Sequence, residues 1–397
     1  MVTVKAGSHV HQILQLLAIS GEFPASSLHL LGNERVVKAL VHRLESVQDV
    51  RFSLEGQTYH TKMLQVSGYR DMRTVRLSKG AIPLLGELHP EAEVYYLRAS
   101  HGHSFSGSVH HIGRNHRVGE AIALAMMAGL EYRPYALPKL HHGFIEKQEI
   151  PKPSFYIARD IKGTEFDNAD KTMFTRIVGA VFSPGGCYAV YNTRSAVMKW
   201  SGMGEFKAQN YLSELARCNY DVSRLKQRSY SAFEIDSTLL LGNNPGVALQ
   251  TILESDKSKR KAARMDSIYP RVHFIPLNSD GIRLLQILTL PDWNERILDA
   301  LFESEVRPKP GYGFMEYDAC INGVYVLSHL DSDLARLIRF REGLRLETDT
   351  ERQFGVVCYP WQAEFLRTYL DGATRLRIIK MENLIEYINQ DLEEQIP

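Results

Sequence analysis

The sequence predicts a mixed α/β protein, and three observations support this fold class. Apolar residues recur at helical spacing up to Glu45. Short strand-like segments separated by turn residues follow up to Leu77. From Ser154 onward, apolar strand-like runs alternate with helical patterns, which is typical of an α/β domain. We therefore expect a helix-rich N-terminal part joined to an α/β region.

The N-terminal elements follow one another at short intervals. Helical spacing predicts three helices, over His9–Ser20, Pro24–Leu31 and Asn33–Glu45. Asn33 is expected to cap the third of these. Strand-like segments come next, at Arg51–Leu54, Tyr59–Val66 and Thr74–Leu77, and a further helix opens at Ser78. Three helices followed by a strand hairpin predict a winged helix-turn-helix domain over residues 1–90.

Cationic side chains gather where a winged helix would contact DNA. With its apolar residues turned inward, the third helix presents Arg35, Lys38, His42 and Arg43. The strands and turns after it add Lys62, Arg70, Arg73, Arg76 and Lys79. We expect the third helix to enter the major groove of double-stranded DNA, and Arg70 and Arg73 to hold phosphates.

Composition excludes several classes of protein. A chain of 397 residues with 44% hydrophobic and 23% charged residues is typical of a globular protein of two or three domains. The four cysteines include no CxxC pair, which argues against a zinc finger or a disulfide framework and for a reducing cytoplasm. No signal peptide or membrane span is evident. The formal net charge of +1 limits any DNA contact to local patches.

Beyond the first domain, the pattern predicts three further segments. Residues 91–150 are expected to form a connecting region between the first domain and the α/β region. It should contain a strand at Val94–Arg98, a histidine-rich loop and a helix at Glu120–Leu130. An α/β domain over 151–280 and a C-terminal α/β subdomain over 281–397 follow, with no evident internal repeat. The predicted strands are Phe155–Ala158, Ile177–Phe182, Cys187–Tyr191, Ala196–Trp200, Tyr230–Ile235, Val272–Ile275, Phe354–Tyr359 and Arg375–Lys380. The predicted helices are Glu205–Cys218, Gly246–Ser255, Gly281–Leu288, Trp293–Phe302, Asp333–Arg341 and Trp361–Leu370. Asn322-Gly323 predicts a hairpin turn between Phe314–Ala319 and Val324–Leu327.

A second candidate chemistry lies between Arg176 and Cys218. Its predicted strand hairpin, third strand and helix resemble the core of PD-(D/E)xK nucleases, in which carboxylates bind a divalent metal. Pro184-Gly185 stands where that motif has Pro-Asp. The candidate catalytic residues are Glu205, Lys207, Glu234 and Asp236. This hypothesis would require Mg²⁺, whereas otherwise no cofactor and no metal site are expected.

Two further clusters carry weaker signals. Seven of the fifteen histidines lie between His101 and His142, but no carboxylate or thiolate stands beside them at ligand spacing, which favours exposed loop residues over a zinc site. A basic run offers a second contact with the DNA backbone, and a solvated loop is the alternative interpretation. Its members are Lys257, Lys259, Arg260 and Lys261.

A winged helix followed by a degenerate restriction-endonuclease-like α/β domain resembles the replication-relaxation family. That family occurs on plasmids and integrative elements of Gram-positive bacteria. The resemblance rests on Leu28–Leu44, on Val75–Leu85 and on Pro184–Lys207. It implies a DNA-binding role in plasmid replication, copy control or transfer.

The preferred interpretation is a cytoplasmic, non-enzymatic DNA-binding protein of a mobile genetic element, acting in replication, copy control, transfer or transcription regulation. Its expected partner is double-stranded DNA. Other replication, transfer or defence proteins and a homodimer are left open. One alternative is a metal-dependent endonuclease. Another is an assembly factor whose winged helix binds protein alone.

Overall fold

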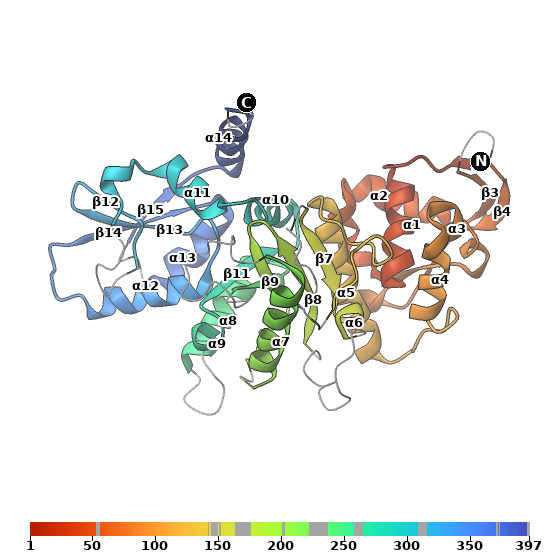
Figure 1. Ribbon diagram of the computed structural model, residues 1–397, viewed down its shortest axis with the longest axis horizontal. Helices are drawn as coiled ribbons and strands as arrows, with labels where there is room; N and C mark the ends of the chain where they lie inside the picture. Colours follow the sequence, from red (N-terminus) through yellow and green to blue (C-terminus); the bar gives the residue numbers. More distant parts are fainter. Residues whose placement is uncertain are drawn as a thin grey trace. The chain divides into compact units, whose positions relative to one another are not determined.

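The structure, a computed structural model, describes residues 1–52, 56–141, 143, 150, 152–162, 176–200, 203–221, 237–257, 265–308, 316–370, 372 and 374–394. It has the mixed α/β composition that the sequence predicts (Figure 1). Two compact units share the chain. The first comprises Met1–Lys139 and Ser154–Asp160, and the second comprises Leu140–Pro153 and Ile161–Pro397. The chain therefore passes from one unit to the other after Lys139, after Pro153 and, within α6 (Ala158–Lys162), after Asp160.

The first unit begins with short elements. In chain order these are β1 (Val2–Thr3), α1 (His9–Ser20), β2 (Glu22–Pro24), the 3₁₀ helix η1 (Ala25–Leu31) and α2 (Glu34–Leu44). Four strands follow, with a 3₁₀ turn before the last, namely β3 (Val47–Arg51), β4 (Tyr59–Lys62), β5 (Leu64–Ser67), η2 (Arg70–Met72) and β6 (Thr74–Leu77). The unit continues with η3 (Lys79–Ala81), α3 (Leu84–Leu88), α4 (Pro90–Ala99), α5 (Val109–Met127) and β7 (Ser154–Ile157).

The strands β1 to β6 form two small sheets, in the orders β1-β3-β4 and β2-β6-β5. The hairpins β3–β4 and β5–β6 are antiparallel, and β2 is antiparallel to β6. The sequence predicts one hairpin after α2, whereas the structure has two, because β3 begins at Val47 and the predicted segment Tyr59–Val66 divides into β4 and β5. Residues 53–55 of the predicted strand Arg51–Leu54 lie outside the described residues.

Helix α5 belongs to the core of the first unit, although its segment is predicted to be a connection. It packs against α1, β2 and η1. Two polar contacts at buried side chains fix it there. Ser27 Oγ donates to Glu120 Oε1 at 2.6 Å, and Thr74 Oγ1 lies 2.7 Å from His116 Nε2. Among the clustered histidines, His116 is therefore a buried partner, whereas His101, His110 and His111 are exposed.

The strand predicted at Val94–Arg98 is wrong, because this segment forms part of α4. The side chain of His89 accepts from the backbone of the first turn, and Pro90 occupies a first-turn position where its missing N–H is harmless. Ala92, Tyr95 and Tyr96 then fall on one buried helical face. A short apolar run alone does not distinguish this spacing from that of a strand.

The second unit holds two successive groups of strands and helices. The first group comprises β8 (Ile177–Ser183), β9 (Gly186–Arg194), α7 (Met203–Asn219), β10 (Ser237–Gly242), α8 (Pro245–Lys257), α9 (Met265–Ile268), β11 (Arg271–Pro276), α10 (Ser279–Leu288), α11 (Trp293–Leu301) and the 3₁₀ turn η6 (Ser304–Val306). The second comprises β12 (Ala319–Ile321), β13 (Val324–Ser328), α12 (Leu334–Leu346), β14 (Gln353–Cys358), η7 (Pro360–Gln362), α13 (Ala363–Tyr369), β15 (Arg375–Ile378) and α14 (Met381–Glu394). No helix among the described residues has both the length and the apolar character needed to cross a bilayer.

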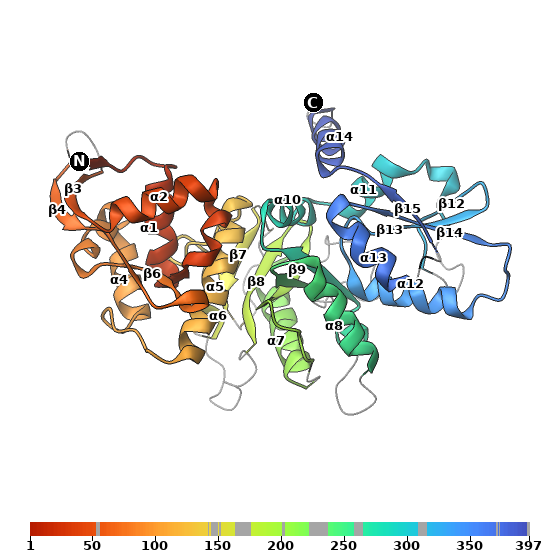
Figure 2. The same cartoon turned by 180° about the vertical axis from the view of Figure 1, so that it is seen from behind.

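The same strand order and direction occur twice in the second unit. An antiparallel hairpin, β8–β9 or β12–β13, is followed by two parallel strands. The neighbours run β8-β9-β10-β11 in one sheet and β12-β13-β14-β15 in the other. Figure 2 shows the two groups as separate sheets. A repeat escapes sequence inspection when buried positions accept any apolar residue of suitable volume.

Two strands that the sequence predicts for the second unit are not observed at the predicted residues. The segment Ala196–Trp200 is irregular, because β9 ends at Arg194, whose φ of 56° lies in the left-handed region. The predicted strand Tyr230–Ile235 lies outside the described residues, and β10 begins after it, at Ser237. The Asn322-Gly323 turn is confirmed, with φ of 50° and 78° between β12 and β13.

Candidate functional site

Helix α2, which is predicted to enter the DNA groove, is positioned by its cap and by one apolar face. The side chain of Asn33 accepts hydrogen bonds from the backbone N–H groups of Arg35 and Val36, at 3.1 and 3.3 Å. This satisfies two of the free donors of the first turn. The buried face consists of Val37, Val41 and Leu44, and α2 packs against η1. The other faces of α2 are therefore left to solvent.

The four cations predicted on α2 are all exposed, but acidic neighbours contact two of them. Lys38 Nζ lies 2.5 Å from Glu34 Oε1, and the hydrogen bond and charge of Lys38 lower the pKa of the Glu34 carboxyl. His42 Nδ1 lies 3.8 Å from Glu45 Oε2. Exposed ion pairs add little stability, because water screens them, so either cation can exchange its partner for a phosphate.

Arg35 and Arg43 carry the charge on α2 that no acidic group compensates. Within the described residues, the Arg35 guanidinium makes no hydrogen bond or ion pair. Arg43 Nη2 donates one long hydrogen bond, of 3.4 Å, to the carbonyl oxygen of Met1. These two side chains are therefore available to an anionic partner without the loss of an ion pair.

The turn between β5 and β6 presents a second set of cations. Arg70 and Arg73 are both exposed, as predicted for side chains that contact phosphates. Tyr69 precedes them with 75% of its surface exposed, and the Arg70 guanidinium lies 5.1 Å from the centre of its ring. Gly68 has a φ of 88°, and a Cβ there would collide with the carbonyl oxygen of Met72, so this position requires glycine.

Arg76, which the sequence groups with the phosphate-binding cations, has a different role. Its Nε donates to Glu22 Oε1 at 2.7 Å, and the Glu22 side chain is only 1% exposed. Asn115 donates to the other carboxylate oxygen of Glu22, and the Arg76 guanidinium lies 4.7 Å from the centre of the Phe105 ring. This buried pair joins β2, β6 and α5, and it removes Arg76 from the candidate interface.

The nuclease candidates are not brought together among the described residues. Glu205 and Lys207 both lie at the start of α7, but Glu205 is buried, with Arg176 Nη1 3.2 Å from its Oε1, and Lys207 is exposed. Glu234 and Asp236 lie outside the described residues. Across the described ranges, no three His, Cys, Asp or Glu side chains are grouped in a way that could hold a metal ion.

The turn at Pro184-Gly185 has no room for the aspartate of the nuclease motif. A Cβ on Gly185 would collide with the backbone carbonyl oxygens of Leu288 and Leu290. The carbonyl of Gly185 also accepts a hydrogen bond of 3.0 Å from Trp293 Nε1. This packing between the β8–β9 turn and α10 explains why glycine occupies the position.

The predicted basic run is described only at its first member. Lys257 is the last residue of α8. The other three, Lys259, Arg260 and Lys261, lie outside the described residues. Their contact with the DNA backbone stays a prediction.

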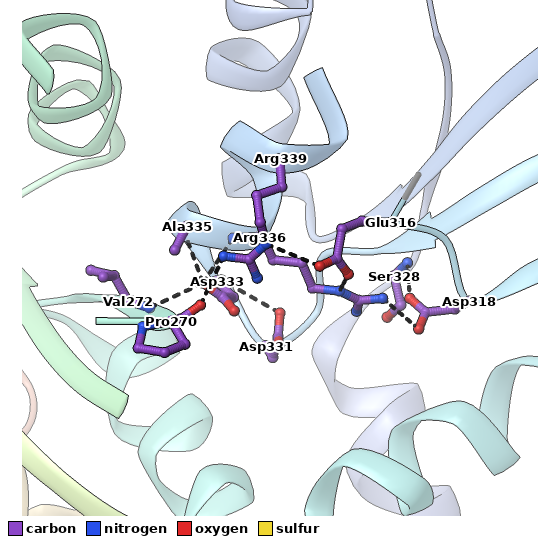
Figure 3. A network of polar contacts seen from close by, with 10 residues as sticks. All are labelled: Pro270, Val272, Glu316, Asp318, Ser328, Asp331, Asp333, Ala335, Arg336 and Arg339. Carbon is purple, nitrogen blue, oxygen red and sulfur yellow. Dashed lines mark hydrogen bonds and ion pairs between the residues drawn. The ribbon is translucent and has the colours of Figure 1, made fainter. Parts of the chain in front are cut away.

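A partly buried ionic network in the second unit was not predicted from the sequence (Figure 3). Arg336 Nε donates to Glu316 Oε2 at 3.1 Å, and its Nη2 donates to Asp318 Oδ1 at 2.7 Å. Arg339 Nε donates to the other oxygen of Glu316 at 3.0 Å. The second oxygen of Asp318 accepts from the backbone N–H of Ser328 at 2.8 Å. The network therefore ties α12 to the β12–β13 hairpin.

Asp333 extends this network to the neighbouring sheet. Its Oδ1 accepts from the backbone N–H groups of Ala335 and Arg336, which caps α12, and from that of Val272 in β11 at 3.0 Å. The carbonyl of Ser332 accepts from the N–H of Phe274 at 2.9 Å. These bonds satisfy donors of β11 that face away from β10. The network is therefore a structural joint between the two sheets, and sequence could not reveal it because its members are separated along the chain.

The pH dependence of stability is expected to report on Asp333. Burial alone would raise the pKa of its carboxyl, but the charges of His273 and Arg339 and the Val272 hydrogen bond hold that pKa below its ordinary value. Its stabilising contribution is therefore present above about pH 4 and is lost as the pH falls below this. Burial shifts the pKa of Asp331 upward, the opposite direction. We therefore expect the difference in unfolding free energy between wild type and Asp333→Asn to shrink from pH 6 to pH 3. A constant difference in urea titrations at the two pH values would contradict this.

No protein-family model, no curated protein and no solved structure matches this chain.

Proposed function

We propose that the protein binds double-stranded DNA through a winged helix in its first unit. In this proposal α1, η1 and α2 are the three helices, and the β5–β6 hairpin is the wing. Its support is the element order and the sheet order β2-β6-β5, in which the strand after α1 joins the hairpin. The observation that carries the proposal is the uncompensated charge of Arg35 and Arg43 on the exposed side of α2.

The side chains divide between base edges and phosphates in this proposal. Residues near the N-terminus of a recognition helix approach the bases, and an arginine there can form two hydrogen bonds with guanine. Arg35, in the first turn of α2, is assigned this role. Arg43 lies in the last turn and, with Arg70 and Arg73, is assigned to phosphates. Lys38 and His42 contribute less, because each has an acidic neighbour.

Binding to a labelled random-sequence duplex over a salt series tests the proposal. Wild type should lose affinity steeply as salt rises, because each neutralised phosphate releases counterions. Arg35→Ala combined with Arg43→Ala should weaken binding by roughly 10- to 100-fold at moderate salt and reduce the slope of log affinity against log salt by about 1, because Arg43 is the one of the two that is assigned to a phosphate. Lys38→Ala alone should have a smaller effect.

The matched control removes the same charge from another part of the first unit. Arg98→Ala combined with Lys139→Ala replaces two exposed cations and should leave affinity within about threefold of wild type. Equal losses in the two double variants would refute the assignment to α2, and no binding at low salt would favour the assembly-factor alternative. The same titration with Mg²⁺ tests the endonuclease alternative, since cleaved DNA would support it.

The biological setting stays a prediction from the family resemblance. Action in plasmid replication, copy control, transfer or transcription regulation is consistent with a DNA-binding first unit. The proposal requires no cofactor. The second unit, with its repeated strand arrangement, is assigned the role of a scaffold, and we assign no chemistry to it.

A further inference from the structure

Among the phenylalanine, tyrosine and tryptophan residues that the structure describes, Tyr69 is the most exposed, at 75%. Its position is fixed by a tight turn. The backbone N–H of Met72 donates to the carbonyl of Tyr69 at 3.1 Å, and that of Arg73 donates to the carbonyl of Arg70 at 3.0 Å. Gly68 provides the left-handed conformation with which the turn begins. The ring is thus held out from the first unit by ordered backbone.

The turn that follows this ring carries two arginines and one exposed acidic residue, Asp71. The Arg70 guanidinium lies 5.1 Å from the ring centre, and Arg73, the residue directly after the 3₁₀ turn, is exposed. An exposed aromatic ring with arginines in the same turn is a combination with which proteins bind unpaired nucleotides, because bases stack on the ring while the arginines neutralise phosphates. Phosphate binding alone would need the arginines but not the ring.

We propose that Tyr69 stacks on an unpaired base, so that the protein prefers DNA in which duplex adjoins an unpaired segment over continuous duplex. This inference rests on the proposed DNA binding and adds the class of DNA bound. Stacking is tolerant of sequence because every base has an aromatic face. The turn therefore selects for the absence of pairing, while α2 contacts the adjoining duplex.

The test compares three labelled DNA molecules of one sequence. The first is fully paired, the second has a central unpaired bubble, and the third has the bubble with its bases replaced by abasic sites. Wild type should bind the bubble about tenfold more tightly than the paired duplex, since stacking one base is worth that order of affinity. The abasic bubble should bind like the paired duplex, because it offers no base on which Tyr69 can stack. It keeps the flexible backbone of the bubble, so it controls for flexibility.

Two variants of Tyr69 separate stacking from charge. Tyr69→Ala should abolish the preference for the bubble and leave the salt slope unchanged, because no cation is lost. Tyr69→Phe keeps the ring and should keep the preference. The side chain is exposed, so neither variant should alter folding. A 2-aminopurine in the bubble should lose fluorescence on binding wild type or Tyr69→Phe, but not Tyr69→Ala.

The outcomes distinguish this inference from the proposed function. Equal affinity of wild type for paired and bubble DNA, unchanged in Tyr69→Ala, would overturn the stacking inference and leave duplex binding intact. Equal preference for the intact and the abasic bubble would also overturn it, because flexibility alone would then explain the selection. Failure to bind any of the three molecules at low salt would overturn the proposed function itself.

Discussion

Asp333→Ala is expected to lower the free energy of unfolding of the second unit by about 3 kcal/mol. The change removes the N-cap of α12, worth about 1 kcal/mol, and leaves the buried N–H of Val272 without an acceptor, at about 1–3 kcal/mol. Asp333→Asn should be less damaging than the alanine variant, because its side-chain oxygen can still accept these bonds. The three tryptophans, Trp200, Trp293 and Trp361, all lie in the second unit, so their fluorescence in a urea titration reports its unfolding.

Asp349→Ala is the matched control for this prediction. Asp349 also accepts a backbone hydrogen bond, from Glu351 at 3.0 Å, but at an exposed position. Water can replace that bond, so the tryptophan transition should shift by less than about 0.5 kcal/mol. Similar shifts for Asp333→Ala and Asp349→Ala would show that the bonds to β11 and α12 do not join the two sheets as described.

Glu22→Ala is expected to destabilise the first unit by about 3–5 kcal/mol, because it leaves the Arg76 charge without its buried carboxylate. The Arg76 side chain is 20% exposed, so water reduces the penalty toward the lower end of this range. The proposed DNA binding should be lost together with the fold of the unit. Far-UV circular dichroism should show a new early transition, while tryptophan fluorescence should be little changed, because the first unit has no tryptophan.

Replacing both partners separates the loss of an ion pair from the loss of one partner. Glu22→Leu combined with Arg76→Leu leaves no unpaired charge and should recover most of the stability, since apolar residues of similar size often replace buried pairs without loss. Glu34→Ala, which removes an exposed carboxylate paired with Lys38, is the control and should be nearly neutral. A double variant as unstable as Glu22→Ala would show that Asn115 or local packing, rather than the charge, accounts for the effect.

The predicted interface depended on local signals, and these could be read from the sequence. The helical spacing predicted the buried side of α2, with Val37, Val41 and Leu44, and Asn33 marked where the helix begins. The spacing also placed Val36 on the inward face, but Val36 is 52% exposed. The sequence did not reveal that Arg76 is withdrawn from the interface, because its partner Glu22 is 54 residues away. Glu34 is close in sequence to Lys38, so the loss of free charge there could have been anticipated from the i, i+4 spacing.

What the sequence determined by itself are features that depend on neighbours along the chain. These include the helical periods of α1 and α2, the Asn33 cap, and the Asn322-Gly323 turn. The tertiary structure decided which distant groups meet, such as Asp333 with β11, and that one strand arrangement is built twice. The physical reason is that backbone conformation follows local spacing and caps, whereas the partner of a buried charge is set by the path of the whole chain. Apolar residues indicate that a segment is buried, but several apolar residue types fit the same buried position. The residue types therefore reveal neither which segment packs against it nor that a strand arrangement is repeated.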